Sequence, residues 1–493
     1  MSITFQDVPA NATASGVFVE QQAVRRTATP GTIPQKLLLI GQPSADVTPD
    51  YNVIQRVFSV GQANQRYGAG SLLASMVETA LARSGGVEVY CVALEEAGES
   101  VQATPTFEVT DAATSDGTFY VYIGGHRVPV TVANEDTVGD IADAIVSAVN
   151  ARVILPVTAE STAGLVTFTV KWAGETGNQV KVEVNILEGD SDTRPSGFDY
   201  TITQATNGAD DPDITPALDA LGEEHITVIA NPYLGSDALD ALKAKADEYA
   251  DPIEKKVFLI ACGYNGDHDD FFTLLDDHNS QFLSFLPVPL SASPEYEIAA
   301  SYGANLARNA NVDPAVPPRT LPLIGIRGAR EYWSYNMRNA VVMDGGSTTL
   351  TGSDRLPLIE GAVTTRTEDA LGNPESAWRF VETVFNIQTK MYQLDVIFGS
   401  EPFVRATVVD DNSTTNKRTA IRPRTVKAFA IQAVDNWINK GWSKERDSIV
   451  EGIVAEIDSD NPGRINLLIP DVIAAGLKIM AVKYEWAFQP ASA

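Results

Sequence analysis

The sequence is poor in cysteine, and this excludes the class of small proteins held together by disulfides. Cys91 and Cys262 are the only cysteines among 493 residues, and each lies in or beside an apolar run typical of a buried strand. A disulfide framework needs more cysteines than this. We expect both thiols to be buried as small apolar side chains.

Positive charge is also scarce. The chain has 36 Lys and Arg against 64 Asp and Glu, which gives a formal net charge of -28. Nucleic acids and anionic membranes bind basic surfaces that displace counterions. Neither is therefore an expected partner.

Long apolar segments are missing as well. No window approaches about 18 uninterrupted apolar residues, the length that could span a bilayer. The first thirty residues contain no basic segment followed by an apolar one, which is the pattern of a signal peptide. We expect a chain that neither spans a membrane nor is secreted by that route.

Signatures of nucleotide binding and hydrolysis are incomplete. Gly68 and Gly70 are followed by Leu73 where a dinucleotide fingerprint requires a third glycine, and no Gly-Lys-Ser/Thr phosphate loop occurs. The nucleophile elbow Gly-x-Ser-x-Gly is absent too. The sequence therefore predicts no catalytic residue and no cofactor.

Histidine is rare, and the best candidate for a metal site is weak. Cys262, His268, Asp269 and His278 lie near one another in sequence, but their spacing fits no common zinc pattern. The run DHDD at 267–270 precedes an apolar segment. Acidic residues there favour a helix N-terminus, where they face the positive end of the helix dipole. We expect no metal ion.

From residue 36 onward, short apolar strands alternate with amphipathic helices, which indicates a mostly parallel α/β sheet. Strands at 37–40 and 87–94 flank a helix at 71–83, which ends at a pair of glycines. The pattern stops near residue 95 and resumes near residue 225. There it predicts three strands, 226–231, 255–262 and 282–288, and three helices, 237–249, 271–278 and 295–309.

The interruption, residues 99–208, is predicted to be a β-rich insertion with one helix. Its expected elements are strands at 118–123, 128–133, 165–172 and 180–187 and a helix at 138–149. Between Glu95 and Asp213 there are 20 acidic and 5 basic residues, a net charge of -15. We expect so acidic a module to face water, where its self-repulsion also keeps copies apart.

Two amphipathic helices are expected after residue 371, both packing in a core. Their apolar positions recur at helical spacing and are Phe380, Val384, Ile387, Met391 and Leu394 in the first helix and Val426, Phe429, Ala433 and Trp437 in the second.

The same region contains the one strongly basic stretch. Eight Lys and Arg face two acidic residues between Lys417 and Arg446. This stretch is either a solvated face or a surface that contacts an acidic partner through charge complementarity. The candidate contact residues are Arg422, Arg424, Lys427, Lys440 and Lys444.

The chain closes with a predicted strand pair at 461–488. A turn at Asn461-Pro462-Gly463 precedes a short strand at 465–469, which Pro470 ends. Polar and apolar residues then alternate from 477 to 488, about twice the length of a typical strand. Because this strand outruns its partner, we expect its outer part to pair with another molecule. The expected contact face is Met480, Val482, Tyr484, Trp486 and Phe488.

A second β-prone segment, Val17, Phe18 and Val19, lies near the other terminus. It is either part of a disordered leader or an arm that pairs with a neighbouring molecule. We favour the arm, because two unpaired strands at the two ends support exchange between copies better than one does.

Several separated motifs together resemble the contractile tail sheath proteins of Mu-like bacteriophages. In chain order they are TFYVYIGGHRVPVTVA at 118–133, KWAGETGNQVKVEVN at 171–185, NVDPAVPPRTLPLIGI at 311–326, GGSTT at 345–349, Arg355-Leu356, AVTTRT at 362–367 and the closing run 461–488. The resemblance covers almost the whole chain. The stretch 401–424 departs from it, being richer in Asp, Asn and Thr than the family pattern.

This resemblance implies a subunit that polymerises as stacked hexameric rings around a tail tube and contracts. It implies a multidomain α/β protein with a subtilisin-like core at 36–98 and 209–370. The insertion at 99–208 would protrude outward, and an α+β C-terminal domain, 371–493, would face the tube. An N-terminal arm, 1–35, and the C-terminal strand would pair with neighbouring subunits.

The resemblance also implies partners and a location. The partners would be further copies, the tail tube protein and the baseplate and tail terminator proteins. The location would be the virion tail, with assembly in the host cytoplasm.

Two other classes stay open from the residues alone. An α/β hydrolase with an unrecognised site would cleave a generic ester or peptide. A secreted adhesin could be built on the β-rich insertion, although the lack of a signal peptide and of disulfides counts against it.

Overall fold

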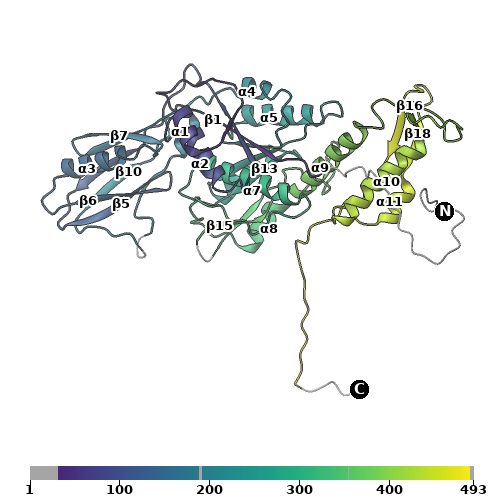
Figure 1. The fold of residues 1–493 in the computed structure, drawn as a ribbon. Coiled ribbons are helices and arrows are strands. Elements are labelled where there is room, and N and C mark those ends of the chain that lie inside the picture. Colours follow the sequence, from purple (N-terminus) through teal and green to yellow (C-terminus); the bar gives the residue numbers. More distant parts are fainter. Residues whose placement is uncertain (1–30, 188–190, 353–354, 489–493) are drawn as a thin grey trace, which may run out of the picture.

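The computed structural model describes residues 31–187, 191–352 and 355–488. Its centre is a six-stranded sheet built from both halves of the predicted α/β pattern (Figure 1). From one edge to the other, the strands are β13 (Leu283–Pro287), β12 (Leu259–Tyr264), β11 (Val228–Asn231), β1 (Lys36–Gly41), β3 (Glu88–Ala93) and β2 (Gln55–Val57).

Five of these strands run parallel, and β2 is antiparallel at the edge, so the prediction of a mostly parallel sheet is confirmed. From β1 to β3 the chain adds strands toward one edge of the sheet, and from β11 to β13 it adds strands toward the opposite edge. Right-handed crossovers then place the intervening helices on opposite faces. The helices of this part are α1 (Val60–Tyr67), α2 (Leu72–Leu81), α4 (Thr215–Asp219), α5 (Ser236–Tyr249), α6 (His268–Asp276), α7 (Glu295–Val312) and α8 (Tyr335–Met343).

Helix α7 lies almost wholly buried against β12, β11, β1 and α2. Small residues let it approach the sheet closely. A Cβ on Gly263 of β12 would stand 2.3 Å from the carbonyl oxygen of Glu295 at the start of α7. This position therefore requires glycine, and the helix and the sheet share one core.

The expectations for cysteine and for the acidic run are confirmed. Cys91 and Cys262 are both free and fully buried, and burial raises the pKa of the Cys262 thiol to about 12. Asp267 is the N-cap of α6, where its side chain accepts a hydrogen bond from the backbone N–H of Asp270 at 2.9 Å.

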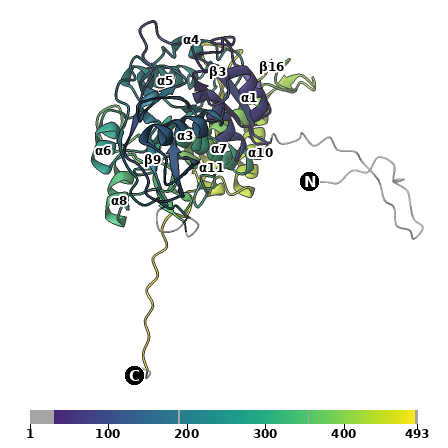
Figure 2. The same cartoon turned by 90° about the vertical axis from the view of Figure 1, so that its left-hand side faces the viewer.

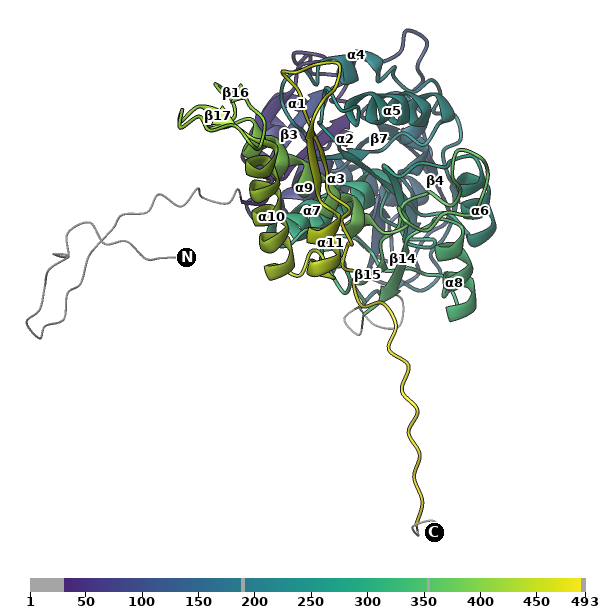
Figure 3. The same ribbon diagram turned by 90° about the vertical axis from the view of Figure 1, so that its right-hand side faces the viewer.

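The β13 edge is extended by a small hairpin. Strands β14 (Thr348–Thr351) and β15 (Pro357–Gly361) pair antiparallel, and the backbone N–H of Ser347 donates to the carbonyl of Phe285 at 3.1 Å. Helix α8 packs beside β14. The α8 end and the β2 end are thus opposite edges of the central layer (Figures 2 and 3).

The insertion forms two sheets of its own and lies at one end of the molecule (Figure 1). Its ends meet, because Val101 and Ala209 form an antiparallel bridge. One sheet has the order β10 (Asp199–Thr203), β4 (Thr106–Asp111), β8 (Leu165–Val170), β7 (Val157–Thr162), and the other has the order β6 (His126–Val132), β5 (Gly117–Ile123), β9 (Val182–Val184). Helix α3 (Val138–Asn150) and a short 3-10 helix, η1 (Glu175–Gln179), complete it.

The C-terminal unit lies at the opposite end of the molecule (Figure 1). Its core contains Trp437, Trp442 and Ile449. The elements are α9 (Val381–Phe398), β16 (Thr407–Val408), β17 (Ala420–Ile421), α10 (Pro423–Asn439), α11 (Arg446–Gly452), β18 (Val454–Ile457) and β19 (Ile465–Leu468).

Helix α9 forms as predicted, and its predicted apolar face packs in part: Val384 is buried, and Met391 and Leu394 pack against the two hydrophobic cores. Ile387, Met391 and Leu394 are only half-buried, whereas Asn386, Lys390 and other polar residues are buried. The helix lies between the α/β layer and the C-terminal unit and is covered on more than one side (Figure 1). Asn386, Gln388 and Lys390 donate to backbone carbonyls of both parts, which compensates part of the cost of burying this polar face.

The prediction for the last strands also needs correction. Strand β19 pairs antiparallel with β18, not with the segment that follows it, and residues 477–487 form no strand within the described chain. No helix in the described residues is long and apolar enough to cross a membrane.

Candidate assembly site

Residues 477–488, which we call the C-terminal tail, leave the molecule as an extended segment that contacts little else beyond Lys478 (Figures 1 and 3). Trp486 is 65% exposed and Phe488 is 93% exposed, with their rings 5.0 Å apart. Met480, Val482 and Tyr484 are exposed as well. Apolar side chains on an unpaired extended segment are an unusual exposure that burial by a partner would remove.

The root of the tail is held firmly, in contrast to its outer part. The Arg319 guanidinium donates to the carbonyl of Lys478 at 2.9 Å and to that of Glu360 at 3.1 Å. Gly476 lies so close to Pro317 that a Cβ there would stand 2.3 Å from the proline ring. Both Pro317 and Arg319 belong to the motif at 311–326, so this motif forms the socket from which the tail emerges.

An ion pair closes the same socket. The Lys478 ammonium pairs with the buried carboxylate of Glu382 at the start of α9. Burial lowers the pKa of Lys478, and the charge of Glu382 opposes this shift. The direction in which the tail leaves is therefore set by the core and by α9 together.

A second buried cation lies further along α9. Lys390 Nζ donates to Asp471 Oδ2 at 2.7 Å, to Ser443 Oγ at 2.8 Å and to the carbonyl of Trp442 at 3.2 Å. Burial lowers the pKa of Lys390, while Asp471 raises it. This network joins α9 to the chain just before the tail.

The hairpin β18–β19 offers two open edges. It is a two-stranded sheet, and no further strand pairs with it in the described part of the chain. One face packs on α10. A hairpin of two strands is marginally stable alone, so it gains from an added strand.

The five candidate basic residues do not form one cluster. Arg422 donates to the carbonyls of Thr415 and Ser413 at 2.7 and 3.1 Å, and Lys427 Nζ donates to the carbonyl of Ile453 at 2.7 Å. These two cations thus stabilise the fold of the C-terminal unit.

The other three basic candidates are exposed. Arg424 is near the start of α10, while Lys440 follows its end and Lys444 lies in the next turn. At 1.5 Å per residue, Arg424 and Lys440 are about 24 Å apart along the helix axis. They could contact a long charged surface, though not one small ligand.

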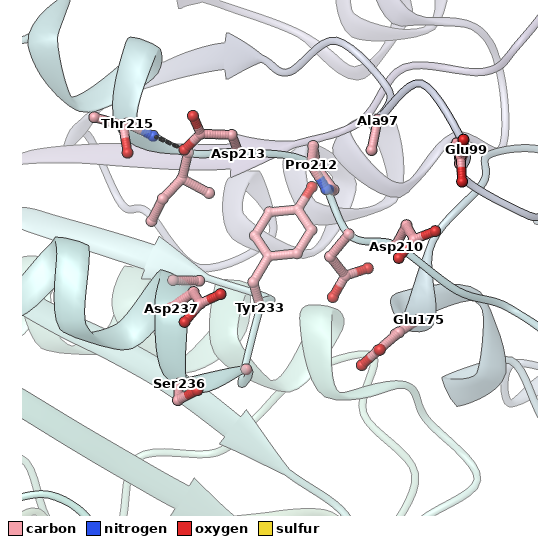
Figure 4. A pocket seen from close by; sticks show the side chains of 14 residues that line it. Ala97, Glu99, Glu175, Asp210, Pro212, Asp213, Thr215, Tyr233, Ser236 and Asp237 are labelled. Atoms are coloured by element: carbon pink, nitrogen blue, oxygen red, sulfur yellow. Dashed lines mark hydrogen bonds between the residues drawn. The ribbon is translucent and has the colours of Figure 1, made fainter.

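An acidic cavity of about 700 Å³ lies where the insertion joins the core (Figure 4). Two of its carboxylates bond to nearby backbone: Asp213 accepts from the N–H of Thr215 at 2.9 Å, and Asp211 accepts from that of Thr176 at 3.2 Å. No group of three or more His, Cys, Asp or Glu among the described residues is placed to hold a metal ion. The cavity is a feature of the junction. Its acidic lining residues are Glu99, Glu175, Asp210, Asp211, Asp213 and Asp237.

The structure thus leaves the predicted face of the tail exposed and separates the basic residues into two groups. The N-terminal candidates Val17, Phe18 and Val19 lie outside the described residues. The tail socket was not predicted. Its only sequence signal was the Pro-rich motif at 311–326, which contains Arg319 but has no pattern that indicates a contact with the tail.

Along almost its full length, the chain is similar to a tail sheath protein, as the motifs predicted. The relative is the Mu-like prophage FluMu tail sheath protein of Haemophilus influenzae, 26% identical over 483 residues, which cover 98% of this chain and 99% of the relative. No protein-family model matches the chain.

Solved structures of sheath proteins are also similar, at lower identity. A sheath tail protein of Desulfitobacterium hafniense is 12% identical, with 93% of this chain and 100% of that chain covered and a TM-score of 0.48. The helical sheath of the anti-feeding prophage in its contracted state is 12% identical, with 97% and 100% covered and a TM-score of 0.48.

Proposed function

We propose that this protein is the structural subunit of a contractile phage tail sheath. Copies stack as hexameric rings around the tail tube and contract to drive the tube through the host envelope. The observation that carries the proposal is the end-to-end similarity to the FluMu tail sheath protein. In this role the protein assembles in the host cytoplasm, becomes part of the virion tail and contacts the tail tube, baseplate and tail terminator proteins.

The two ends of the molecule fit different surroundings in such a tube. In the proposed arrangement, the core at 36–98 and 209–370 is subtilisin-like, the insertion at 99–208 points outward and the unit at 371–493 faces the tube. The insertion and the C-terminal unit lie at opposite ends of the core (Figure 1). The region from Glu95 to Asp213 carries -15 of the net charge of -28, and the C-terminal unit carries the one strongly basic stretch, 417–446, which favours this orientation.

Copies are linked in this proposal by the C-terminal tail, which adds a strand to a neighbouring copy. The tail has a fixed root and an exposed outer part, which suits a donated strand. The open edges of the β18–β19 hairpin are the acceptor that the geometry favours. Main-chain hydrogen bonds give such a link its strength, and Trp486 and Phe488 anchor it. A head-to-tail link of this kind need not close, so it propagates.

Truncation after Ala481 tests the proposal. Because the removed residues contact little of their own chain, the shortened protein should unfold at the same denaturant concentration as the full chain. It should fail to build tubes in electron micrographs. Tubes of normal length from the truncated protein would refute the strand link, and unfolding of the monomer would show that the tail belongs to its own core.

A further inference from the structure

The α/β layer and the C-terminal unit have separate hydrophobic cores, which helix α9 joins (Figure 1). Val384 and Phe385 near its start pack in the first core, while Leu394 and Ile397 near its end pack against the second. Much of the remaining buried surface of the helix is polar. Charged and amide side chains are seldom buried in such number. The buried polar residues of α9 are Glu382, Asn386, Gln388, Thr389, Lys390 and Gln393.

The contact between α9 and the rest of the C-terminal unit, which we call the polar seam, is made largely of hydrogen bonds. Asn386 Nδ2 donates to the carbonyl of Trp442 at 3.0 Å, and Trp437 Nε1 donates to Gln393 Oε1 at 2.8 Å. Lys390 adds the three bonds described above. Relative motion of two domains is the default expectation unless the interface between them is large and hydrophobic. The polar seam is not an interface of that kind.

The same face of α9 is incompletely bonded. Glu382 Oε2, Asn386 Oδ1 and Thr389 Oγ1 are buried and have no hydrogen-bond partner among the residues that the structure describes. These three residues follow one another at spacings of four and three, so they lie on one face of the helix. An unpaired buried acceptor destabilises the arrangement that leaves it unpaired. The observed position of the C-terminal unit on α9 therefore leaves polar atoms that another position could bond.

We infer that the rest of the C-terminal unit moves as a body against the α/β layer, with the polar seam as the sliding surface. The unit is joined to the layer at two places, the end of α9 and the segment that runs from β19 to the tail. This segment also follows α9, because Asp471 bonds to Lys390 and a Cβ on Gly476 would stand 3.3 Å from Glu382 Oε1. Both connections thus lie along one helix, which can serve as the axis of a shear motion.

In the proposed sheath, this motion changes the angle between the donor and the acceptor of the strand link. The root of the tail is fixed to the α/β layer through Arg319, whereas the β18–β19 hairpin packs on α10 in the moving part. Motion at the seam therefore lets linked copies rearrange while the ladder hydrogen bonds of the donated strand stay intact. This consequence rests on the proposed function, but the motion itself does not.

Distances within one copy test the motion directly. Ile253→Cys on the α/β layer and Ser448→Cys on α11 both replace exposed residues, and both native cysteines are buried, so spin labels attach at the new sites. The labelled full chain is diluted in an excess of unlabelled protein, so that pulsed electron paramagnetic resonance measures only distances inside a copy. We expect a broad or two-peaked distribution of distances between these two labels.

The control pair, Ile253→Cys with Tyr335→Cys, has both labels on the α/β layer and should give a narrow distribution. A wild-type seam as narrow as this control overturns the inference, whether or not the protein builds tubes.

A variant of the seam tests the reason for the motion. Lys390→Met, Ser443→Ala and Asp471→Leu together remove its central polar groups without leaving a charge unpaired. The distribution across the seam should then narrow to the width of the control pair, because the two cores meet through apolar side chains. A triple variant that folds and stays as broad as the wild type also overturns the inference. A broad wild-type distribution in a protein that never builds tubes would support the motion and refute the proposed sheath alone.

Discussion

Lys390 illustrates how single buried side chains join the C-terminal unit to the core. Its ammonium has three partners, and one of them, Asp471, also accepts a hydrogen bond from Ser443 at 2.6 Å. Removing one member of a buried ion pair leaves the other charge without compensation, which costs more than the pair itself contributes.

Lys390→Ala should therefore destabilise the C-terminal unit by about 3 kcal/mol. The measurement is urea unfolding followed by tryptophan fluorescence, since Trp437 and Trp442 lie in this unit. Lys255→Ala is the matched control, because Lys255 pairs with Asp395 of the same helix at 2.5 Å but both side chains are about half exposed. Its effect should stay below about 1 kcal/mol. Equal losses in both variants would contradict the structural role of Lys390.

His126 joins the insertion to the core and should make this joint sensitive to pH. Its Nε2 lies 3.4 Å from the carboxylate of Glu297 on α7. Burial lowers the pKa of His126, but the hydrogen bond and charge of Glu297 outweigh this, so the pKa is raised above 6.5. Glu78 acts in the same direction, and Arg327 opposes it.

A raised histidine pKa stabilises the folded state fully below pH 6.5, and this contribution is lost as the pH rises through the folded pKa. The thermal midpoint of the wild type should therefore fall toward that of His126→Gln as the pH rises above 6.5. His225 and His278 have lowered pKa values from burial and act at lower pH in both proteins, so the difference between the two isolates His126. A difference independent of pH would contradict the ion pair.

At the scale of residues, the sequence predicts best the environment of side chains whose local pattern is typical of one structure only. The apolar runs around Cys91 and Cys262 predict their burial, and the run at 267–270 predicts a helix cap. The buried polar residues of α9 could not be predicted, because their partners are backbone carbonyls far away in sequence. Gln388, for instance, donates to the carbonyl of Val257 at 2.6 Å.

Among the elements, the C-terminal tail allows a test that distinguishes one paired edge from two. Successive N–H groups of a strand point to opposite sides, so a proline removes a donor from one side only. If the tail pairs on one edge, one of the variants Val482→Pro and Lys483→Pro should abolish tubes while the other is tolerated. If it is inserted between two strands, both should abolish them. Normal tubes from both variants would contradict strand exchange.

The exposed basic residues of the C-terminal unit support a second prediction at the scale of elements. Reversing Arg424, Lys440 and Lys444 to Glu should leave assembly without a tube intact and weaken co-assembly on a purified tail tube. The effect should be largest at low salt, where screening is weakest. Arg422 and Lys427 are excluded because they hold the fold together. Unchanged co-assembly at low salt would mean that the stretch is only solvated surface.

Most helices and central strands follow from the sequence because their periodicity is strong and local. The pairing of β19 with β18 does not follow from the sequence, since β18 is short and half exposed and its residues, VAEI, do not alternate between apolar and polar side chains. The tail has the alternation of a strand but no partner within its own described chain. Pattern alone predicts that a strand can form there, but not which chain supplies the ladder.

For the molecule as a whole, the central α/β layer, the insertion and the C-terminal unit could be predicted, because the pattern of apolar and charged residues changes between them along the chain. Their arrangement in space could not, because it depends on contacts such as the bridge between Val101 and Ala209 and the position of α9 between two bodies. The resemblance to tail sheath proteins indicates the proposed function. The exposed tail, and the position of the insertion and the C-terminal unit at opposite ends of the molecule, give it a physical basis.

Electron microscopy of the purified full chain at high concentration tests the central claim most directly. A sheath subunit that links head to tail should form striated hollow cylinders whose end-on views show sixfold rings. The bore should be wide enough for a tail tube, and the truncation after Ala481 should form none. A monodisperse two-fold dimer at every concentration, with no tubes, would contradict the account.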